Sequence, residues 1–202
     1  MNMKSIDKTN RKKVQAVVPL YINSPSLFPI VTDFFESMEE HYPDIELIVI
    51  DDCSPMKHSF PITHQNKKNM GFTKTVNKGL KLSKADVILV LNDDLKIAKG
   101  DLDRYYLISG LGIWSPRDTA SDDSDRFGAI WGLTRQTLNR LGFMNDKFKN
   151  YFSDNDYYQR AKKLDIQIVK WHDICVEHRE NATFKNEDKE KLFNEDKDAF
   201  FS

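Results

Sequence analysis

The sequence of 202 residues lacks the features that mark secreted, membrane-spanning or disulfide-stabilised proteins. It contains only two cysteines, Cys53 and Cys175, which do not make a disulfide framework and fit a reducing compartment. No apolar run approaches the ~18 residues of a membrane span. The polar stretch 1–13 also lacks the apolar core of a signal peptide. We therefore expect a cytoplasmic protein, either soluble or peripherally bound, with no transmembrane segment.

An excess of charge of one sign is missing as well. The 30 Lys and Arg residues are balanced by 31 Asp and Glu residues, so the formal net charge is -1. A chain without an overall basic field does not attract nucleic acid through its net charge, although a local basic face stays open. There is also no Gly-x-Gly-x-x-Gly after the first predicted strand, which argues against a dinucleotide-binding fold and against a P-loop.

What the sequence does contain is the pattern of one α/β domain. Hydrophobic residues make up 40% of the chain and aromatic residues 11%, which is enough for a proper core. Apolar runs and helical periodicities alternate along the chain. They predict strands at 14–21, 45–50, 61–65, 87–91, 127–133 and 166–171, and helices at 27–41, 73–82, 101–108, 134–141 and 154–164. Gly79, inside a predicted helix, indicates the close approach of a neighbouring element or a ligand.

The stretch from Val87 to Asp94 is the centre of the pattern. Five apolar residues run directly into Asn92, Asp93 and Asp94, as in a buried strand whose carboxyl end is polar. Open α/β sheets bind ligands at that edge. Two adjacent carboxylates are costly to hold together unless a positive charge lies nearby. A magnesium or manganese ion that holds a diphosphate would supply it, whereas the alternative is a solvated strand end with two surface acids.

A second acid-ended strand comes earlier in the chain. Residues 45–50 are followed by Asp51 and Asp52, and the preceding elements are a strand and a helix. Strand, helix and acid-ended strand form the first half of a nucleotide-binding α/β unit.

The ordered series of motifs resembles the inverting nucleotide-sugar glycosyltransferases of family 2, which have the GT-A fold. The resemblance covers about Val14 to His178. Its motifs are Val17-Val18-Pro19-Leu20-Tyr21 with Asn23; Ile48-Val49-Ile50-Asp51-Asp52-Cys53-Ser54; Asn69-x-Gly71-Phe72 and Asn77-x-Gly79-Leu80; Leu91-Asn92-Asp93-Asp94; Gly128-Ala129 to Arg135 and Leu141-Gly142 to Phe148; and Tyr151-Phe152-Ser153-Asp154-Asn155-Asp156 with Arg160. Each motif alone is weak, but their order and spacing together are specific.

The resemblance implies a single GT-A-like α/β domain with a mixed, mostly parallel central sheet flanked by helices. It implies the following organisation: a loose leader at 1–12; a glycosyltransferase domain at 13–178, with a nucleotide-sugar half at 13–95 and an acceptor half at 96–178; and a charged C-terminal helical tail or lid at 179–202. The implied activity is metal-dependent, inverting transfer of a sugar from a nucleoside-diphosphate sugar to an acceptor hydroxyl of a glycan, a lipid-linked or another acceptor.

The same resemblance implies roles for donor-side residues. Asp52 would accept a hydrogen bond from the base, and Tyr21 would pack on the ring, where the alternatives are a helix-capping acid and a core tyrosine. Asp94 and His178 would bind Mn²⁺ or Mg²⁺; a structural histidine is the alternative for His178, and His172 is its local competitor. The other donor-side residues would be Pro19, Asp51, Asn77, Asn92 and Asp93, although Asp51 could orient its loop instead.

On the acceptor side, the resemblance implies that Asp154 is the general base of a single displacement. An aspartate that opens a helix is also stabilised in its charged form, and an N-cap role is compatible with catalysis. Trp131 and Asp156 would meet the acceptor. The alternatives are a core tryptophan and an i, i+4 ion pair of Asp156 with Arg160.

Two departures from the family pattern affect these roles. Asn92 stands where the family has the first acid of Asp-x-Asp, so the cation would rely on Asp94, with Asp93 nearby. Ser153 stands where the family has a glutamate, so Asp154 alone would be the base. The rival functions are a non-catalytic relative that binds a nucleotide or a partner and a nucleotidyltransferase. A modified phage DNA base is kept as a minority option for the acceptor.

Overall fold

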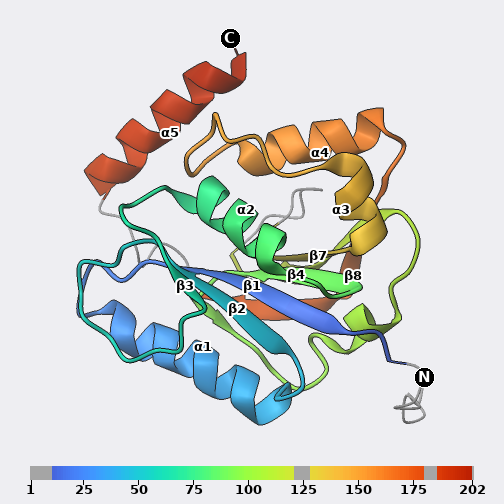
Figure 1. The fold of residues 1–202 in the computed structure, drawn as a ribbon, viewed down its shortest axis with the longest axis horizontal. Helices are drawn as coiled ribbons and strands as arrows, with labels where there is room; N and C mark the ends of the chain where they lie inside the picture. The colour runs from blue at the N-terminus through green and yellow to red at the C-terminus, as the bar shows by residue number, and fades with distance from the viewer. Residues whose placement is uncertain (1–10, 121–127, 180–185, 202) are drawn as a thin grey trace.

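The computed structural model describes residues 11–120, 128–179 and 186–201. Within these ranges the chain forms one α/β domain in which helices cover both faces of a central sheet (Figure 1). The predicted leader lies mostly outside the described residues. The strands are β1 Val14–Leu20, β2 Glu46–Asp51, β3 His64–Gln65, β4 Val87–Leu91, β5 Leu95–Lys96, β6 Gly112–Asp118, β7 Ile130–Thr134 and β8 Gln167–His178. The helices are α1 Leu27–His41, α2 Phe72–Leu82, α3 Arg135–Leu141, α4 Ser153–Lys163, α5 Asn186–Phe201 and the 3-10 helix η2 Asp103–Leu107.

The described strands form a mixed sheet in the order β3-β2-β1-β4-β7-β6-β8-β5. β1, β2, β3 and β4 run parallel, so their carboxyl ends meet at one edge. β7 runs antiparallel to both β4 and β6, and β8 runs parallel to β6. The prediction of a single α/β domain with a mixed sheet flanked by helices is confirmed.

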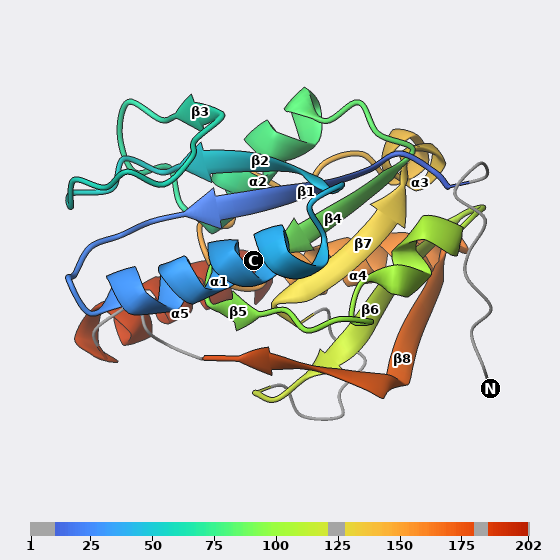
Figure 2. The same cartoon turned by 90° about the horizontal axis from the view of Figure 1, so that it is seen from below.

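Two apolar cores hold these layers together. One lies between the sheet and α1, around Phe34, and the other lies between the sheet and α2, α3 and α4, around Val76 (Figure 2). All five residues of β4 are buried, because both of its faces are covered. A Cβ atom on Gly79 would come within 2.2 Å of Val17 Cγ1, so this glycine lets α2 approach β1 closely.

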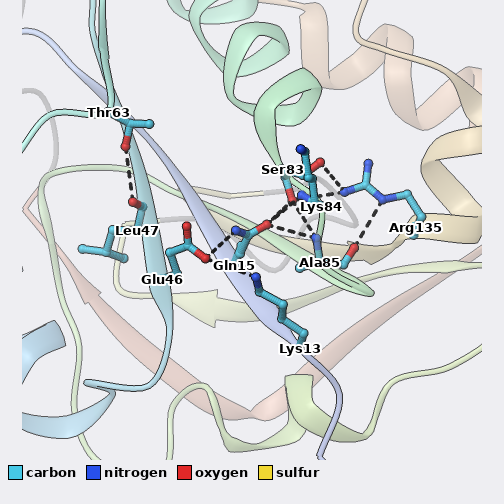
Figure 3. A network of polar contacts seen from close by, with 9 residues as sticks. All are labelled: Lys13, Gln15, Glu46, Leu47, Thr63, Ser83, Lys84, Ala85 and Arg135. Atoms are coloured by element: carbon cyan, nitrogen blue, oxygen red, sulfur yellow. Dashed lines mark hydrogen bonds and ion pairs between the residues drawn. The ribbon is translucent and has the colours of Figure 1, made fainter.

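The amino ends of β1 and β4 are closed by a network of polar contacts around the buried side chain of Gln15 (Figure 3). Its Nε2 donates to Glu46 Oε2 at 2.7 Å. Its Oε1 accepts from Ser83 Oγ at 2.9 Å, from Lys84 N at 2.8 Å and from Ala85 N at 3.0 Å. The turn between α2 and β4 is therefore fixed by one side chain from β1.

Arg135, the first residue of α3, supports the same turn from the other side. Its Nη2 donates to the carbonyl oxygen of Ser83 at 2.8 Å, and its Nε donates to that of Ala85 at 3.3 Å. Burial lowers the pKa of this guanidinium from its ordinary value. The amino edge of the sheet thus uses its polar groups to hold backbone in place.

Strands β5 and β6 were not among the predicted strands, and three further elements differ from the sequence prediction. The helix expected at 101–108 is a 3-10 helix at Asp103–Leu107. The strand expected at 166–171 continues to His178, because β8 pairs with β6 beyond a register shift at Pro116/Arg117 and then with β5. The second half of β8 has a short apolar stretch, Ile174 to Val176, between polar and partly exposed residues, so it lacks the apolar run that marks a buried strand. Helix α4 begins at Ser153 with Phe152 as its N-cap, so Asp154 is a residue of the first turn and not the cap.

Candidate functional site

A pocket of about 230 Å³ opens at the carboxyl edge of the sheet, where β1, β4 and β8 end. The structure brings together there most of the residues that the sequence predicted for the donor and the metal: Pro19, Tyr21, Asp52, Asn92, Asp93, Asp94 and His178. Residues from four different parts of the chain therefore converge on one cavity, at the edge where parallel α/β sheets bind ligands.

Asp52 is buried and held firmly in the wall of this pocket. Its Oδ1 accepts from Asn66 Nδ2 and from Met70 N, and its Oδ2 accepts from Gly71 N, each at 2.8 Å. Gly71 has a φ of 84° and no room for a Cβ atom, which would lie 2.5 Å from Lys149 Cγ. A carboxylate oxygen has about two acceptor positions, so Oδ2 has capacity for one more donor.

Asp51 and Asn77 are placed elsewhere. Asp51 accepts from the backbone and hydroxyl of Ser54 at 2.9 and 2.6 Å and from Gln65 Nε2 at 2.8 Å, which orders the loop after β2. Asn77 bonds through its amide to the backbone N and O of Met144 at 2.9 and 2.8 Å. Neither residue lines the pocket, and both make structural contacts across the fold.

The two acids after β4, Asp93 and Asp94, lie in an electrostatically unfavourable part of the pocket. Burial, together with the neighbouring charge of Asp94, raises the pKa of Asp93 to about 8. Oδ1 of Asp94 is buried and makes no hydrogen bond to the described residues, although His178 Nε2 lies 3.2 Å from it as an ion-pair partner. A buried carboxylate oxygen with so little hydrogen bonding has capacity for a further positive ligand.

His178 stands between two carboxylates. Pairing of β5 with β8 sets Leu95 opposite His178, which places the imidazole beside Asp94. Nδ1 of His178 lies 3.3 Å from Asp118 Oδ1. Burial alone would lower the pKa of His178, but the contacts with Asp118 and Asp94 outweigh it and raise the pKa to about 10. His172, the local competitor, does not line this pocket.

The donor atoms present fit a hard divalent cation. A carboxylate oxygen and an imidazole nitrogen suit manganese or magnesium, which take their remaining ligands from water and substrate phosphates. Among the described residues, no three His, Cys, Asp or Glu side chains are already arranged to hold an ion. The protein alone would therefore offer two ligands, Asp94 and His178. The observation that supports a cation there is the buried Oδ1 of Asp94, which has His178 as an ion-pair partner but makes no hydrogen bond to the described residues.

A second pocket of about 400 Å³ adjoins the first. The two share Phe72, Asn92 and Asn150 in their walls, so they are neighbouring compartments of one site. Asp154 and Trp131, both predicted for the acceptor side, line the second pocket. Because Asp154 lies in the first turn of α4, the helix dipole favours its ionised form.

The remaining acceptor-side prediction is placed differently. Asp156 accepts from Arg160 Nε at 2.8 Å, as an i, i+4 pair on α4, and does not line either pocket. Trp131 is buried, with its ring centroid 5.8 Å from that of Tyr157, and thus combines a core role with a place in the pocket wall.

Several site residues escaped the sequence analysis. Asn150 lines both pockets, and its Oδ1 accepts from Phe72 N at 3.0 Å. Asp118 ends β6 and contacts His178, and Phe193 of α5 lines the second pocket. Nothing local identifies these residues, because each reaches the site through a contact with a distant segment of the chain.

The comparisons with known proteins agree with this geometry. The model of the family described as Glycosyl transferase family 2 matches residues 16–106. This stretch of the chain is therefore similar to the family 2 glycosyltransferases. A search of the curated proteins finds no match. The family match covers β1 to η2, and so includes Asp52, Asn92, Asp93 and Asp94 of the first pocket.

Solved structures of glycosyltransferases share the GT-A fold of this domain. The mannosyltransferase PcManGT from Pyrobaculum calidifontis, in complex with GDP-Man and Mn²⁺, matches with a TM-score of 0.70 and 14% identity over 88% of this chain and 60% of that chain. GalNAc-T7 with UDP, GalNAc and Mn²⁺ matches with a TM-score of 0.66 and 12% identity over 85% of this chain and 44% of that chain. Residues 1–349 of TarS from S. aureus match with a TM-score of 0.63 and 14% identity over 94% of this chain and 72% of that chain.

The chain spans only 60% and 44% of the length of the first two of these proteins. In the described part of the chain, no helix has both the length and the apolar character needed to cross a bilayer.

Proposed function

We propose that this protein is a metal-dependent, inverting glycosyltransferase that moves a sugar from a nucleoside-diphosphate sugar to an acceptor hydroxyl. One observation carries the proposal: Asp52, Asp94 and His178 line one pocket, and Asp154 lines the pocket next to it. The family 2 match and the complexes of similar structures with GDP-Man or UDP and Mn²⁺ support it.

On the donor side, Asp52 is suited to recognise a nucleobase. Three donors fix its carboxylate, and the free acceptor position on Oδ2 matches a ring N–H such as that of uracil, thymine or guanine. Tyr21 and Pro19 line the same pocket and supply apolar surface for the ring.

The diphosphate would lie toward Asp94 and His178, which would hold the cation. A bound Mn²⁺ or Mg²⁺ neutralises the charge that develops on a leaving diphosphate. Asp118 contacts the opposite ring nitrogen of His178 and so orients the imidazole, as carboxylates commonly do for histidine ligands. Asn92 lies between the two pockets, where an amide can bond donor oxygens without adding a third charge.

Asp154 would remove the proton of the acceptor hydroxyl while that oxygen attacks the anomeric carbon from the side opposite the diphosphate. A single displacement of this kind inverts the anomeric configuration. The acceptor would bind in the second pocket, with Trp131 in its wall. Ser153 is buried at the start of α4 beside Asp154, so the base role falls to one carboxylate.

A second candidate is a non-catalytic relative that binds a nucleotide. Asn92 and Ser153 favour it, because each replaces an acid of the family pattern. A nucleotidyltransferase is less well supported, since the loop after β1 has no glycine-rich phosphate-binding sequence.

Calorimetric titration with UDP, GDP, TDP and CDP, each with and without Mn²⁺, tests the proposal. We expect one diphosphate to bind with a clear dependence on the metal and Asp94→Ala to abolish that dependence. The matched control is Asp86→Ala, an exposed aspartate just before the opposite end of β4. A folded protein that binds none of the four nucleotides would refute the metal–diphosphate site.

A further inference from the structure

Helix α5 carries a buried acid, Asp196, within residues 190–201, the part of the helix whose side chains the structure describes. Asp196 is 3% exposed, whereas its neighbours Glu195 and Lys197 are exposed. Its carboxylate accepts three backbone hydrogen bonds of 2.8 Å: Oδ1 accepts from Lys149 N, and Oδ2 accepts from Asn150 N and Tyr151 N. Bonds from backbone N–H groups to a carboxylate are stronger than neutral ones. This contact therefore fixes three consecutive residues of a loop.

That loop segment, residues 149–152, has an unfavourable backbone geometry of its own. Phe152 has a φ of 58°, in the left-handed region that a bulky residue rarely adopts. Its ring packs against Phe193 and Phe200 of α5, with ring centroids 5.1 and 5.3 Å apart. The strained turn that starts α4 is thus held from outside by α5, through Asp196 on one side and an aromatic cluster on the other.

The same segment shapes both pockets. The carbonyl oxygen of Lys149 accepts from Thr73 N at 3.1 Å, and Asn150 Oδ1 accepts from Phe72 N at 3.0 Å, which fixes the start of α2. Asn150 lines both pockets. Asp154 follows Phe152 by two residues, so the position of the general base depends on the conformation of this segment.

Helix α5 also contributes surface to the second pocket directly. Phe193 lines that pocket and is 41% exposed, so part of its ring is available to a ligand. Together with Phe72 and Trp131 it gives the pocket aromatic walls. In Figure 1 the helix lies outside the three layers, next to the loop that leads into α4.

We propose that α5 completes the acceptor site. In this proposal Asp196 is a positioning residue that fixes segment 149–152 and thereby Asp154, and Phe193 is a specificity-determining residue that offers an aromatic face to the ring of a saccharide acceptor. The proposal rests on the proposed glycosyl transfer. It assigns the C-terminal helix to the acceptor pocket. On the donor side the segment contributes Asn150, whereas the bonds that hold Asp52 come from Asn66, Met70 and Gly71.

Asp196→Asn tests the positioning role. An asparagine has the same shape but only one oxygen, and its NH₂ group faces backbone donors, so it cannot accept all three bonds. We expect the rate of nucleotide-sugar hydrolysis, in which water is the acceptor, to fall by about tenfold or more at saturating donor, since small misplacements of a catalytic group are costly. The affinity for the nucleoside diphosphate with Mn²⁺ should stay within about twofold, because the base-binding carboxylate keeps its partners.

The matched control is Asp198→Asn, the same charge change at an exposed position of the same helix. Amide hydrogen exchange at Lys149, Asn150 and Tyr151 is followed in parallel. Faster exchange with an unchanged hydrolysis rate would show that Asp196 has a purely structural role and would overturn its assignment as a positioning residue. Absence of nucleotide binding and hydrolysis in the unmodified protein would instead refute the proposed function.

Phe193→Ala tests the specificity role with a side chain whose exposure makes misfolding a minor concern. The acceptor probes are p-nitrophenyl glycosides of glucose, galactose, xylose and N-acetylglucosamine. We expect Phe193→Ala to raise the KM of the best glycoside by about three- to tenfold, the worth of an aromatic contact. The donor affinity should be retained, and the kcat should change less than the KM because Phe200 still packs on Phe152. Phe201→Ala, which alters a 74% exposed residue outside the pocket, is the control. An unchanged KM, or no glycoside that binds, would overturn the saccharide assignment.

Discussion

The two ends of the central sheet both bury polar side chains, but they do so in opposite ways. At the amino end, Gln15 makes four hydrogen bonds of 2.7–3.0 Å to its surroundings. At the carboxyl end, Asp93 and Asp94 lie side by side, and burial with that neighbouring charge raises the pKa of Asp93 to about 8. A buried oxygen of Asp94 makes no hydrogen bond to the described residues. Strands β1 and β4 thus run from an edge where the buried polar side chains have their hydrogen-bond partners to an edge where a buried carboxylate oxygen lacks them.

The difference shows where this fold uses its polar groups for stability and where it keeps them for a ligand. Buried polar groups whose hydrogen bonds are all made hold the backbone in place. Buried groups that repel a neighbouring charge, or that lack hydrogen-bond partners, commonly mark a binding site. Mutations at the amino end should therefore change folding and leave binding intact. Mutations at the carboxyl end should do the reverse.

The largest effect is expected from Asp154→Asn, which removes the proposed general base and leaves the shape of the site intact. We expect turnover of the nucleotide sugar to fall by about 10²- to 10⁴-fold, the usual worth of a general base. The affinity for nucleoside diphosphate with Mn²⁺ should be unchanged. Steady-state kinetics and calorimetry on the same samples measure both quantities.

Asp86→Asn, at the start of β4, is the control for this prediction and should retain full turnover. If Asp154→Asn kept more than a tenth of the activity, another residue would have to be the base, and the proposed mechanism would be wrong.

A smaller effect, on stability alone, is expected from Gln15→Leu. The change removes the buried acceptor of Ser83 Oγ and of the backbone N–H groups of Lys84 and Ala85, of which Ala85 keeps only a longer bond of 3.4 Å to Ser83 Oγ. Such losses cost about 1–3 kcal/mol each at most, and relaxation lowers the sum, so we expect a loss of about 2–4 kcal/mol in the free energy of unfolding. Urea denaturation measures it.

Gln136→Leu, an exposed substitution on α3, is the comparison for Gln15→Leu and should change the free energy of unfolding by less than about 0.5 kcal/mol. Nucleotide affinity should be the same in both variants. A Gln15→Leu protein that loses nucleotide binding while it stays folded would show that the two ends of the sheet are coupled.

Much of the donor pocket was predictable because its residues follow buried strands. Apolar runs identify β1, β2 and β4, and parallel strands bring their carboxyl ends together, so Tyr21, Asp52 and Asp94 were expected to meet. Asp51 shows the limit of this reasoning. It follows the same strand as Asp52, but its side chain is bonded to Ser54 and Gln65.

The acceptor pocket was less predictable, because distant segments build it. The end of β8, which delivers His178 to the donor pocket, was hard to predict for the same reason, because it forms through pairing with β6 and β5. Asp196 and Phe193 lie in a charged tail whose composition predicts only a helix. Their partners, Lys149 to Phe152, are more than 40 residues away in the sequence, so no local signal connects the two segments.

The smallest and most discriminating effect is expected from Asp93→Asn, which removes one of the two adjacent charges. We expect the metal-free variant to unfold at a higher temperature at pH 8, because burial and the repulsion by Asp94 oppose the ionised form of Asp93. The gain should be modest, of the order of 1 kcal/mol, since stabilising changes at functional sites are usually of this size. The affinity of the same variant for Mn²⁺, measured in the presence of nucleoside diphosphate, should fall. Asp86→Asn, a change at an exposed position just before the opposite end of β4, should alter neither quantity. A variant that gains stability and keeps its full metal and nucleotide affinity would mean that the charge pair is not retained for the cation, and the contrast between the two ends of the sheet would lose its functional meaning.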